Sequence, residues 1–122
     1  MLTDTAVLPP LRKACFRLPG ATETVTFGHP TFQIEGKTFA VLEEYKGELG
    51  IAVKVERNLQ SVFLKDPRFF MTPYIGKHGW VTLSVNAAPL NWKEIAELLA
   101  GSYRLVKPSP RVRSKHKNQS GV

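Results

Sequence analysis

The sequence predicts an α+β domain in which a mainly antiparallel sheet packs against about three helices. Apolar residues recur at helical spacing in three separate stretches, near residues 12, 60 and 95. Between these stretches the chain alternates apolar and polar residues, as half-buried strands do. With 122 residues, 43% of them hydrophobic, the chain is long enough to bury one core without disulfides.

The first helix is predicted over residues 12–18. Pro9-Pro10 suits its first turn, and Pro19-Gly20 is typical of its end. The residues expected on its buried stripe are Leu11, Ala14, Cys15 and Leu18.

Strand-forming residues dominate the next segment, residues 24–55. Phe32 and Ile34 alternate with Gln33, and the following Glu35-Gly36 predicts a two-residue hairpin turn. A second hairpin is predicted around residues 46–48. With those three residues as the loop, apolar residues oppose one another across the pair: Tyr45 with Leu49, Val41 with Val53, and Phe39 with Val55.

Helical spacing returns over residues 56–65, where Leu59, Val62 and Phe63 are expected to point inward before Pro67 ends the helix. A short strand over residues 69–71 and a clearer one over residues 80–85 follow.

The last helix begins after Asn91, a favoured N-cap residue, and Glu94 completes a capping-box pattern. Its expected buried stripe is Ile95, Leu98 and Leu99. Gly101 should loosen its end, although residues 102–106 can add a further turn.

The positive charge of the chain is unevenly distributed. Five of its 17 basic residues follow Val106, leaving 12 basic and all 10 acidic residues in the body. We therefore expect a domain over residues 1–106 and a basic, disordered tail over residues 107–122. The tail is either a nonspecific nucleic-acid arm or a solubilising extension.

No reaction is suggested by the motifs of the chain. The single cysteine, Cys15, is expected to be inert packing, and the histidines lack metal-binding spacing. Phosphate-binding loops and nucleophile-elbow patterns are missing from the sequence. We expect a non-enzymatic, cytoplasmic monomer without a cofactor, because no secretory leader or apolar membrane span is evident.

Residues 73–80 form the most distinctive stretch, because two glycines bracket Lys77 and His78. The segment suggests a recognition loop in which both side chains meet a phosphate. A tight turn that needs the glycines for itself explains the same pattern. Trp80 either stacks on bases or packs half-buried at the start of a strand.

Several short motifs resemble the MmcQ/YjbR-like family of small bacterial proteins. They occur in order over roughly residues 8–106: Leu18-Pro19-Gly20, Gly28-His29-Pro30 with Phe32, Gly36-Lys37-Thr38-Phe39-Ala40, Lys77-His78-Gly79-Trp80-Val81 and Ser102-Tyr103-Arg104-Leu105. The resemblance implies an α+β domain with two wing-like hairpins and a proposed DNA-binding role.

On this basis we expect Lys37, Lys77, His78, Trp80 and Arg104 to contact DNA, chiefly its phosphates. For each of them an ordinary solvated or packing role is the simpler reading.

Two other interpretations stay open. One is a module without a nucleic-acid role, which holds a peptide or protein partner in a groove lined by Phe32, Phe39 and Tyr74. The other is a small-ligand site near Gly28-His29-Pro30.

Overall fold

A six-stranded antiparallel sheet, in the order β1-β2-β3-β4-β6-β5, forms the centre of the molecule. It is seen in a computed structural model that describes residues 1–108. The strands are β1 (Thr22–Thr26), β2 (His29–Ile34), β3 (Lys37–Tyr45), β4 (Glu48–Lys54), β5 (Phe69–Met71) and β6 (Trp80–Ser84).

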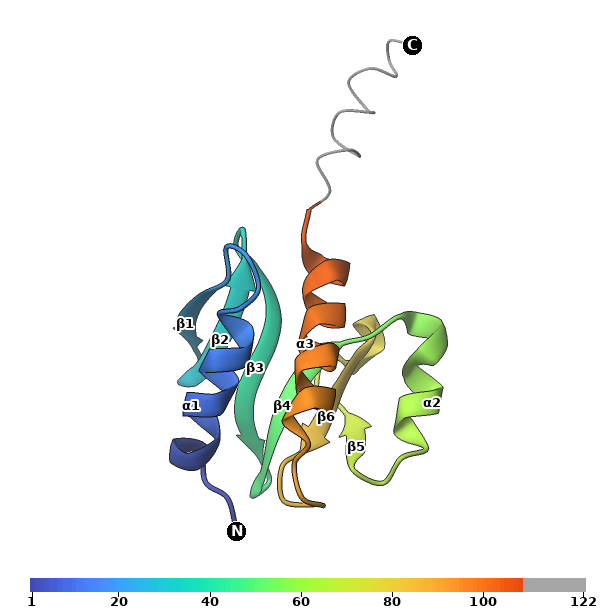
Figure 1. Cartoon of the computed structure of the whole chain (residues 1–122). Coiled ribbons are helices and arrows are strands. Elements are labelled where there is room, and N and C mark those ends of the chain that lie inside the picture. Colours follow the sequence, from blue (N-terminus) through green and yellow to red (C-terminus); the bar gives the residue numbers. More distant parts are fainter. Residues whose placement is uncertain (109–122) are drawn as a thin grey trace.

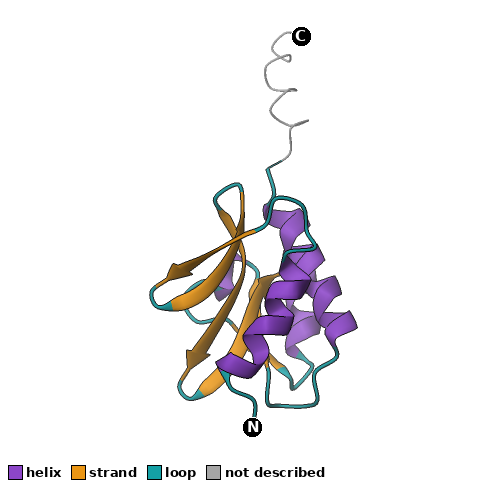
Figure 2. Cartoon of the chain, turned by 60° about the vertical axis from the view of Figure 1, so that its left-hand side comes forward, coloured by secondary structure: helices purple, strands orange, loops and turns teal. Residues whose placement is uncertain are grey.

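Three α-helices lie on one side of this sheet (Figure 2). They are α1 (Asp4–Cys15), α2 (Gln60–Leu64) and α3 (Trp92–Val106), with 3₁₀ turns η1 (Arg57–Leu59) and η2 (Gly76–His78). Helix α3 packs on β3 and β4, α1 lies beside α3, and α2 covers β5 and β6 (Figure 1). The predicted α+β class with a mainly antiparallel sheet is confirmed.

Helix α1 starts much earlier than the predicted residues 12–18, and it ends at Cys15. Pro9 and Pro10 lie inside it, where each removes a backbone donor. The helix forms because Val7, Leu11 and Cys15, spaced four residues apart, are all buried in the core. Tertiary burial therefore overrides the local penalty of two prolines.

Two-residue turns join the first four strands. In Phe27-Gly28, Glu35-Gly36 and Lys46-Gly47 both residues have positive φ, between 50° and 82°, as in type I′ hairpins. The prediction for Glu35-Gly36 is confirmed. The predicted three-residue loop at 46–48 is wrong, because Tyr45 pairs with Glu48 rather than Leu49.

The error of one residue carries along the whole β3–β4 pair, where Val41 opposes Ala52. Apolar matching could not fix this register because both faces of the pair are largely buried. A bulge adds to the ambiguity: Phe39 has no partner in β2, and both Phe39 and Ala40 turn into the core.

Helix α2 is shorter and less buried than predicted. Leu59 and Val62, expected to point inward, are exposed, whereas Phe63 packs edge-on against Phe69 with ring centroids 5.3 Å apart. The segment consists of the 3₁₀ turn η1 followed by the short helix α2, which differ in the number of residues per turn. Residues 56–65 therefore do not share one buried helical face.

Helix α3 follows its prediction more closely. The Asn91 side chain accepts hydrogen bonds from the backbone N–H groups of Lys93 (3.0 Å) and Glu94 (3.1 Å). Glu94 does not return the capping-box bond, because its carboxylate binds Arg68 instead. The helix runs through Gly101 to Val106. The predicted tail, beyond Lys107 and Pro108, lies outside the described residues.

Candidate functional site

The segment between β5 and β6 holds the predicted recognition loop. Its centre is the 3₁₀ turn η2, closed by hydrogen bonds from the Gly76 N–H to the Thr72 carbonyl and from the Gly79 N–H to the Gly76 carbonyl, both 2.9 Å. Lys77 and His78 are exposed at this turn. The sequence-predicted pair is therefore displayed to solvent.

Gln60, at the start of α2, fixes this turn from behind. Its side-chain amide donates to the carbonyl of Gly76 (2.7 Å) and to that of Trp80 (3.0 Å), which lie on either side of Lys77 and His78. The loop is thus held at both ends by one side chain. Sequence reasoning missed Gln60, because a single glutamine in a helical stretch carries no motif.

The glycines of the loop serve close packing. Gly79 has φ 94°, and a Cβ there would lie 2.9 Å from the Val55 carbonyl oxygen and 3.2 Å from Cδ of Arg57. The aliphatic stem of Arg57 therefore lies over Gly79, next to Lys77 and His78. Arg57 is a second basic residue at this site that sequence reasoning missed.

These residues belong to one end of the sheet. Lys37 begins β3 beside the β2–β3 turn, Lys54 ends the antiparallel β4, and Trp80 pairs with Lys54. The last turn of α3 reaches the same end (Figure 1). We call the basic end the following six side chains: Lys37, Lys54, Arg57, Lys77, Arg104 and Lys107.

Five of these side chains are exposed and Lys54 is half-buried. The ion pairs found within residues 1–108 are Arg12–Glu23, Arg68–Asp66 and Arg68–Glu94, none of which involves the basic end. Two acidic residues, Glu56 and Glu97, lie near Lys54 and Arg104 around a small depression. The basic end therefore keeps a net positive charge available to an anion.

Trp80 differs in exposure from the other four predicted DNA contacts, which are exposed. It is 8% exposed, and its neighbours along β6, Val81 and Leu83, point to the opposite face and into the core. Trp80 is therefore a buried packing residue, more enclosed than the predicted half-buried position, and is not an open stacking platform. Its side chain lines a groove on the sheet face away from the helices.

This groove, of about 520 Å³, is the second candidate site, and we call it the aromatic groove. Thr31 and Val41, partners across β2 and β3, lie in it. The aromatic and ionisable residues around it are Phe27, His29, Glu43, Glu44, Tyr45, Tyr74 and Trp80.

The groove differs from the one predicted. Phe32 and Phe39 are completely buried in the core on the helix side, and cannot line it. Only Tyr74 of the predicted trio does so, and it is 87% exposed. Phe27, at a hairpin turn, was missed because Phe-Gly is not a usual turn signal. The predicted small-ligand residues Gly28, His29 and Pro30 line a separate depression, and His29 also lines the groove.

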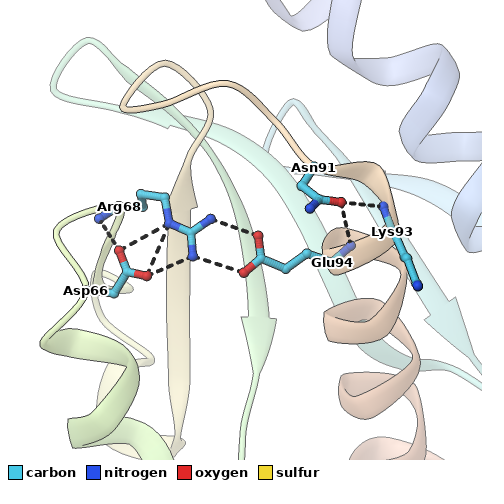
Figure 3. Close-up of polar contacts among 5 residues, drawn as sticks. All are labelled: Asp66, Arg68, Asn91, Lys93 and Glu94. Carbon is cyan, nitrogen blue, oxygen red and sulfur yellow. Dashed lines mark hydrogen bonds and ion pairs between the residues drawn. The ribbon is translucent and has the colours of Figure 1, made fainter.

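A polar cluster links the start of α3 to β5 (Figure 3). The Arg68 guanidinium donates to Asp66 (2.7 Å at Oδ2) and to both oxygens of Glu94 (2.8 and 2.9 Å). Hydrogen bonding to Arg68 holds the pKa of Asp66 and that of Glu94 below their usual range. The three side chains satisfy one another, which indicates a structural role.

Chemistry at Cys15 is disfavoured by its surroundings. Desolvation by burial, with a smaller contribution from Glu23, raises the pKa of the thiol to about 12. The thiolate, which is the nucleophile, is therefore scarce at neutral pH. Within residues 1–108 no cluster of histidine, cysteine or acidic side chains is suited to holding a metal ion.

No helix in the described part of the chain has the length and apolar character required to cross a bilayer.

Comparison with known proteins agrees with the architecture. A protein from Deinococcus radiodurans, DR2400 with a DUF419 domain, superposes with a TM-score of 0.69 at 23% identity, over 80% of this chain and 76% of the other. A Pseudomonas syringae protein gives a TM-score of 0.67 at 20% identity, over 88% and 100% of the two chains. At these identities the likeness shows the fold. No curated protein matches the chain.

The family comparison covers most of the fold just described. The YjbR family model matches residues 16–105, from the end of α1 to the last turn of α3. The predicted resemblance is confirmed, and the chain belongs to the YjbR family.

Proposed function

We propose that the protein is a non-enzymatic, monomeric and cytoplasmic DNA-binding module that contacts phosphates through its basic end. The observation that supports the proposal is the packing of the Arg57 side-chain stem over Gly79, the residue that follows the exposed Lys77 and His78. Arginine and lysine side chains are the usual partners of DNA phosphates.

Several further features support the proposal. The hairpin that carries Lys37 reaches the same end as the last turn of α3, so basic residues from four separate segments lie at one end of the sheet. Gln60 holds the Lys77 turn in place, so less ordering is needed on binding. The basic residues after Pro108 are joined to this end in sequence and would add a nonspecific electrostatic attraction.

Binding on this account depends on salt rather than on sequence. If all six cations of the basic end each meet one phosphate, the slope of log affinity against log salt is roughly −5. Because these contacts reach the backbone rather than base edges, different duplexes of the same length should bind with similar affinity.

The test compares two triple variants of the full chain. Lys37→Ala, Arg57→Ala and Lys77→Ala together remove three charges from the basic end. Lys46→Ala, Lys65→Ala and Lys93→Ala remove three exposed charges elsewhere. Fluorescence anisotropy with a short duplex across a salt series should show weaker binding and a flatter slope for the first variant alone.

A third variant isolates the basic residues beyond the described part of the chain. Their charge is removed, and the basic end is left intact, by the combined substitutions Arg111→Gln, Arg113→Gln, Lys115→Gln and Lys117→Gln. Residual salt-dependent binding by this variant supports the folded surface as a site. Equal losses in the two triple variants, or complete loss on neutralising the four positions, would reject the basic end as the binding surface.

A further inference from the structure

We propose that the aromatic groove binds a peptide segment of a partner protein and receives an arginine or lysine side chain at Glu43. This site adjoins the basic end at Tyr74 and Trp80, but its charged lining residues, Glu43 and Glu44, are acidic.

Phe27 is the first observation. It occupies the first position of a type I′ turn with φ 52°, where a bulky side chain is strained, and its side chain is 94% exposed. The corresponding turn residues of the next two hairpins are the polar Glu35 and Lys46. An aromatic ring at this position gains almost no burial within residues 1–108, so nearly the whole ring is accessible to a ligand.

Tyr74 repeats this pattern on a different segment. It has φ 66° and is 87% exposed, and it lines the same groove as Phe27. Phe27 comes from the β1–β2 edge of the sheet, whereas Tyr74 follows β5 at the other edge. The sheet curls so that both edges border one groove. Two strained, exposed aromatic residues therefore flank a single surface.

The walls of the groove are held by the fold. On the Tyr74 side, the Thr72 and Thr82 hydroxyl groups share a hydrogen bond of 2.9 Å, and the Gly76 N–H closes the turn on Thr72. On the Phe27 side, the two-residue turn leaves the hairpin little freedom. A ligand therefore meets a largely preformed site.

The lining carries negative charge. Lysine and arginine are absent from the groove lining, whose acidic residues are Glu43 and Glu44. Glu43 lies on the same strand face as Val41 and Tyr45, because side chains alternate along β3. Neither glutamate forms an ion pair with another residue in the range 1–108.

This chemistry selects the occupant. Carboxylates in a groove repel a phosphate backbone and attract a cation, and the Trp80 ring in the lining can add cation–π attraction, whereas the Tyr45 ring already holds Lys46 Nζ at 5.4 Å from its centroid. An apolar chain lying across the groove covers Phe27 and Tyr74 at once, whereas a small molecule on the floor leaves both rings in water. The geometry therefore favours a peptide with a basic side chain between apolar neighbours.

The experiment titrates the full chain with two blocked peptides of the same length. One alternates leucine with arginine, and the other replaces each arginine with its neutral isostere citrulline. A Trp92→Phe background leaves Trp80, which lines the groove, as the reporting tryptophan, and calorimetry provides an independent affinity. We expect the arginine peptide to bind roughly tenfold more tightly than the citrulline peptide.

Variants assign that preference to the groove. Glu43→Gln should reduce binding of the arginine peptide to the citrulline level and leave the citrulline peptide unaffected. Phe27→Asn should weaken both peptides about fivefold or more, because the ring contributes to either complex. Glu35→Asn changes the equivalent turn residue of another hairpin and should leave binding unchanged.

The proposal is overturned if the two peptides bind equally, or if the arginine peptide fails to bind the folded protein. It is also overturned if Glu43→Gln has no effect on the preference. Displacement of the bound peptide by a single-stranded oligonucleotide, lost in the Phe27→Asn variant, would assign the groove to nucleic acid instead.

Discussion

At the scale of single residues, backbone angles and exposure identify positions where the folded chain carries a local conformational free-energy cost. Phe27 and Tyr74 both take left-handed backbone angles with bulky side chains that face solvent. Gly79 takes the same region without cost, and in doing so lets Arg57 pack against the loop. The first two residues belong to the aromatic groove, and Gly79 belongs to the basic end.

Phe27→Asn should stabilise the protein by about 1 kcal/mol, because asparagine tolerates the left-handed region and Asn-Gly is the preferred type I′ pair. The exposed ring contributes little burial that could be lost. Urea unfolding followed by circular dichroism measures the change. An equal or lower unfolding free energy would mean that the ring has stabilising contacts beyond those described.

At the scale of elements, neighbouring segments hold one another in position through a few side chains. Ser102 of α3 donates to the Phe39 carbonyl at 2.6 Å and accepts from the Lys54 N–H at 2.9 Å, which ties the helix to β3 and β4. Gln60 ties α2 to the loop before β6. These contacts position the basic end from behind.

Two glycine substitutions should have opposite effects. Gly101 lies within α3, and a Cβ there meets nothing within 4 Å, so Gly101→Ala should stabilise by about 0.8 kcal/mol. Gly79→Ala adds a left-handed alanine and a collision with the Val55 carbonyl, so it should destabilise by about 2 kcal/mol. Chemical denaturation measures the change in unfolding free energy of each variant. A change in the same direction for both variants would contradict the prediction.

The contact between Arg68 and the start of α3 should make the unfolding free energy depend on pH in the acidic range. Asp66 and Glu94 have lowered pKa values in the folded state, so the unfolded chain binds more protons at low pH. Their contribution is complete above the ordinary carboxyl range, about pH 4–4.5, and is lost as pH falls through the lowered values.

Arg68→Met should therefore lower the unfolding free energy at neutral pH and flatten its decline between about pH 5 and pH 2. Urea midpoints measured across this range provide the comparison. Lys93→Met is the matched control. It removes an exposed cation from the first turn of α3, where Glu94 lies, and leaves the contacts of Arg68 with Asp66 and Glu94 unchanged. The same slope in Arg68→Met and the parent chain would rule out this coupling.

At the scale of the whole molecule, charge is divided along the strand direction. The basic end lies beside the β2–β3 turn, whereas Glu43, Glu44 and Glu48 lie toward the β3–β4 turn at the opposite end (Figure 1). The nearly balanced body charge seen in the sequence therefore hides two regions of opposite sign. Each of the two proposed sites uses one of them.

Local signals explain which parts of this arrangement could be predicted from sequence. The Asn91 cap and the Glu35-Gly36 turn depend on neighbouring residues, and each is found as expected. Strand β6 also lies where the apolar alternation predicts a strand, but all five of its residues are buried, so burial does not alternate along it. Exposure of Lys77 and His78 follows from their place between two turn glycines.

Long-range contacts explain what sequence reasoning missed. Helix α1 persists through Pro9 and Pro10 only because the sheet and α3 bury its other side. Arg57 and Gln60 reach the loop after β5 through packing between segments some 20 residues apart, which no local pattern encodes. The groove depends on the curl of the sheet, so its aromatic residues could not be grouped from their positions in the chain.

The three two-residue turns have a consequence for how the chain folds. Strands β1 to β4 each pair with the next strand in sequence, so little loop-closure entropy opposes their assembly. Strands β5 and β6, by contrast, pair with each other across residues 72–79, and they reach β4 only after the longer segment that contains α2. We expect the four-strand meander to form early and the β5–β6 pair to join it late, so that the loop carrying Lys77 and Tyr74 reaches its place beside β4 in the last step of folding.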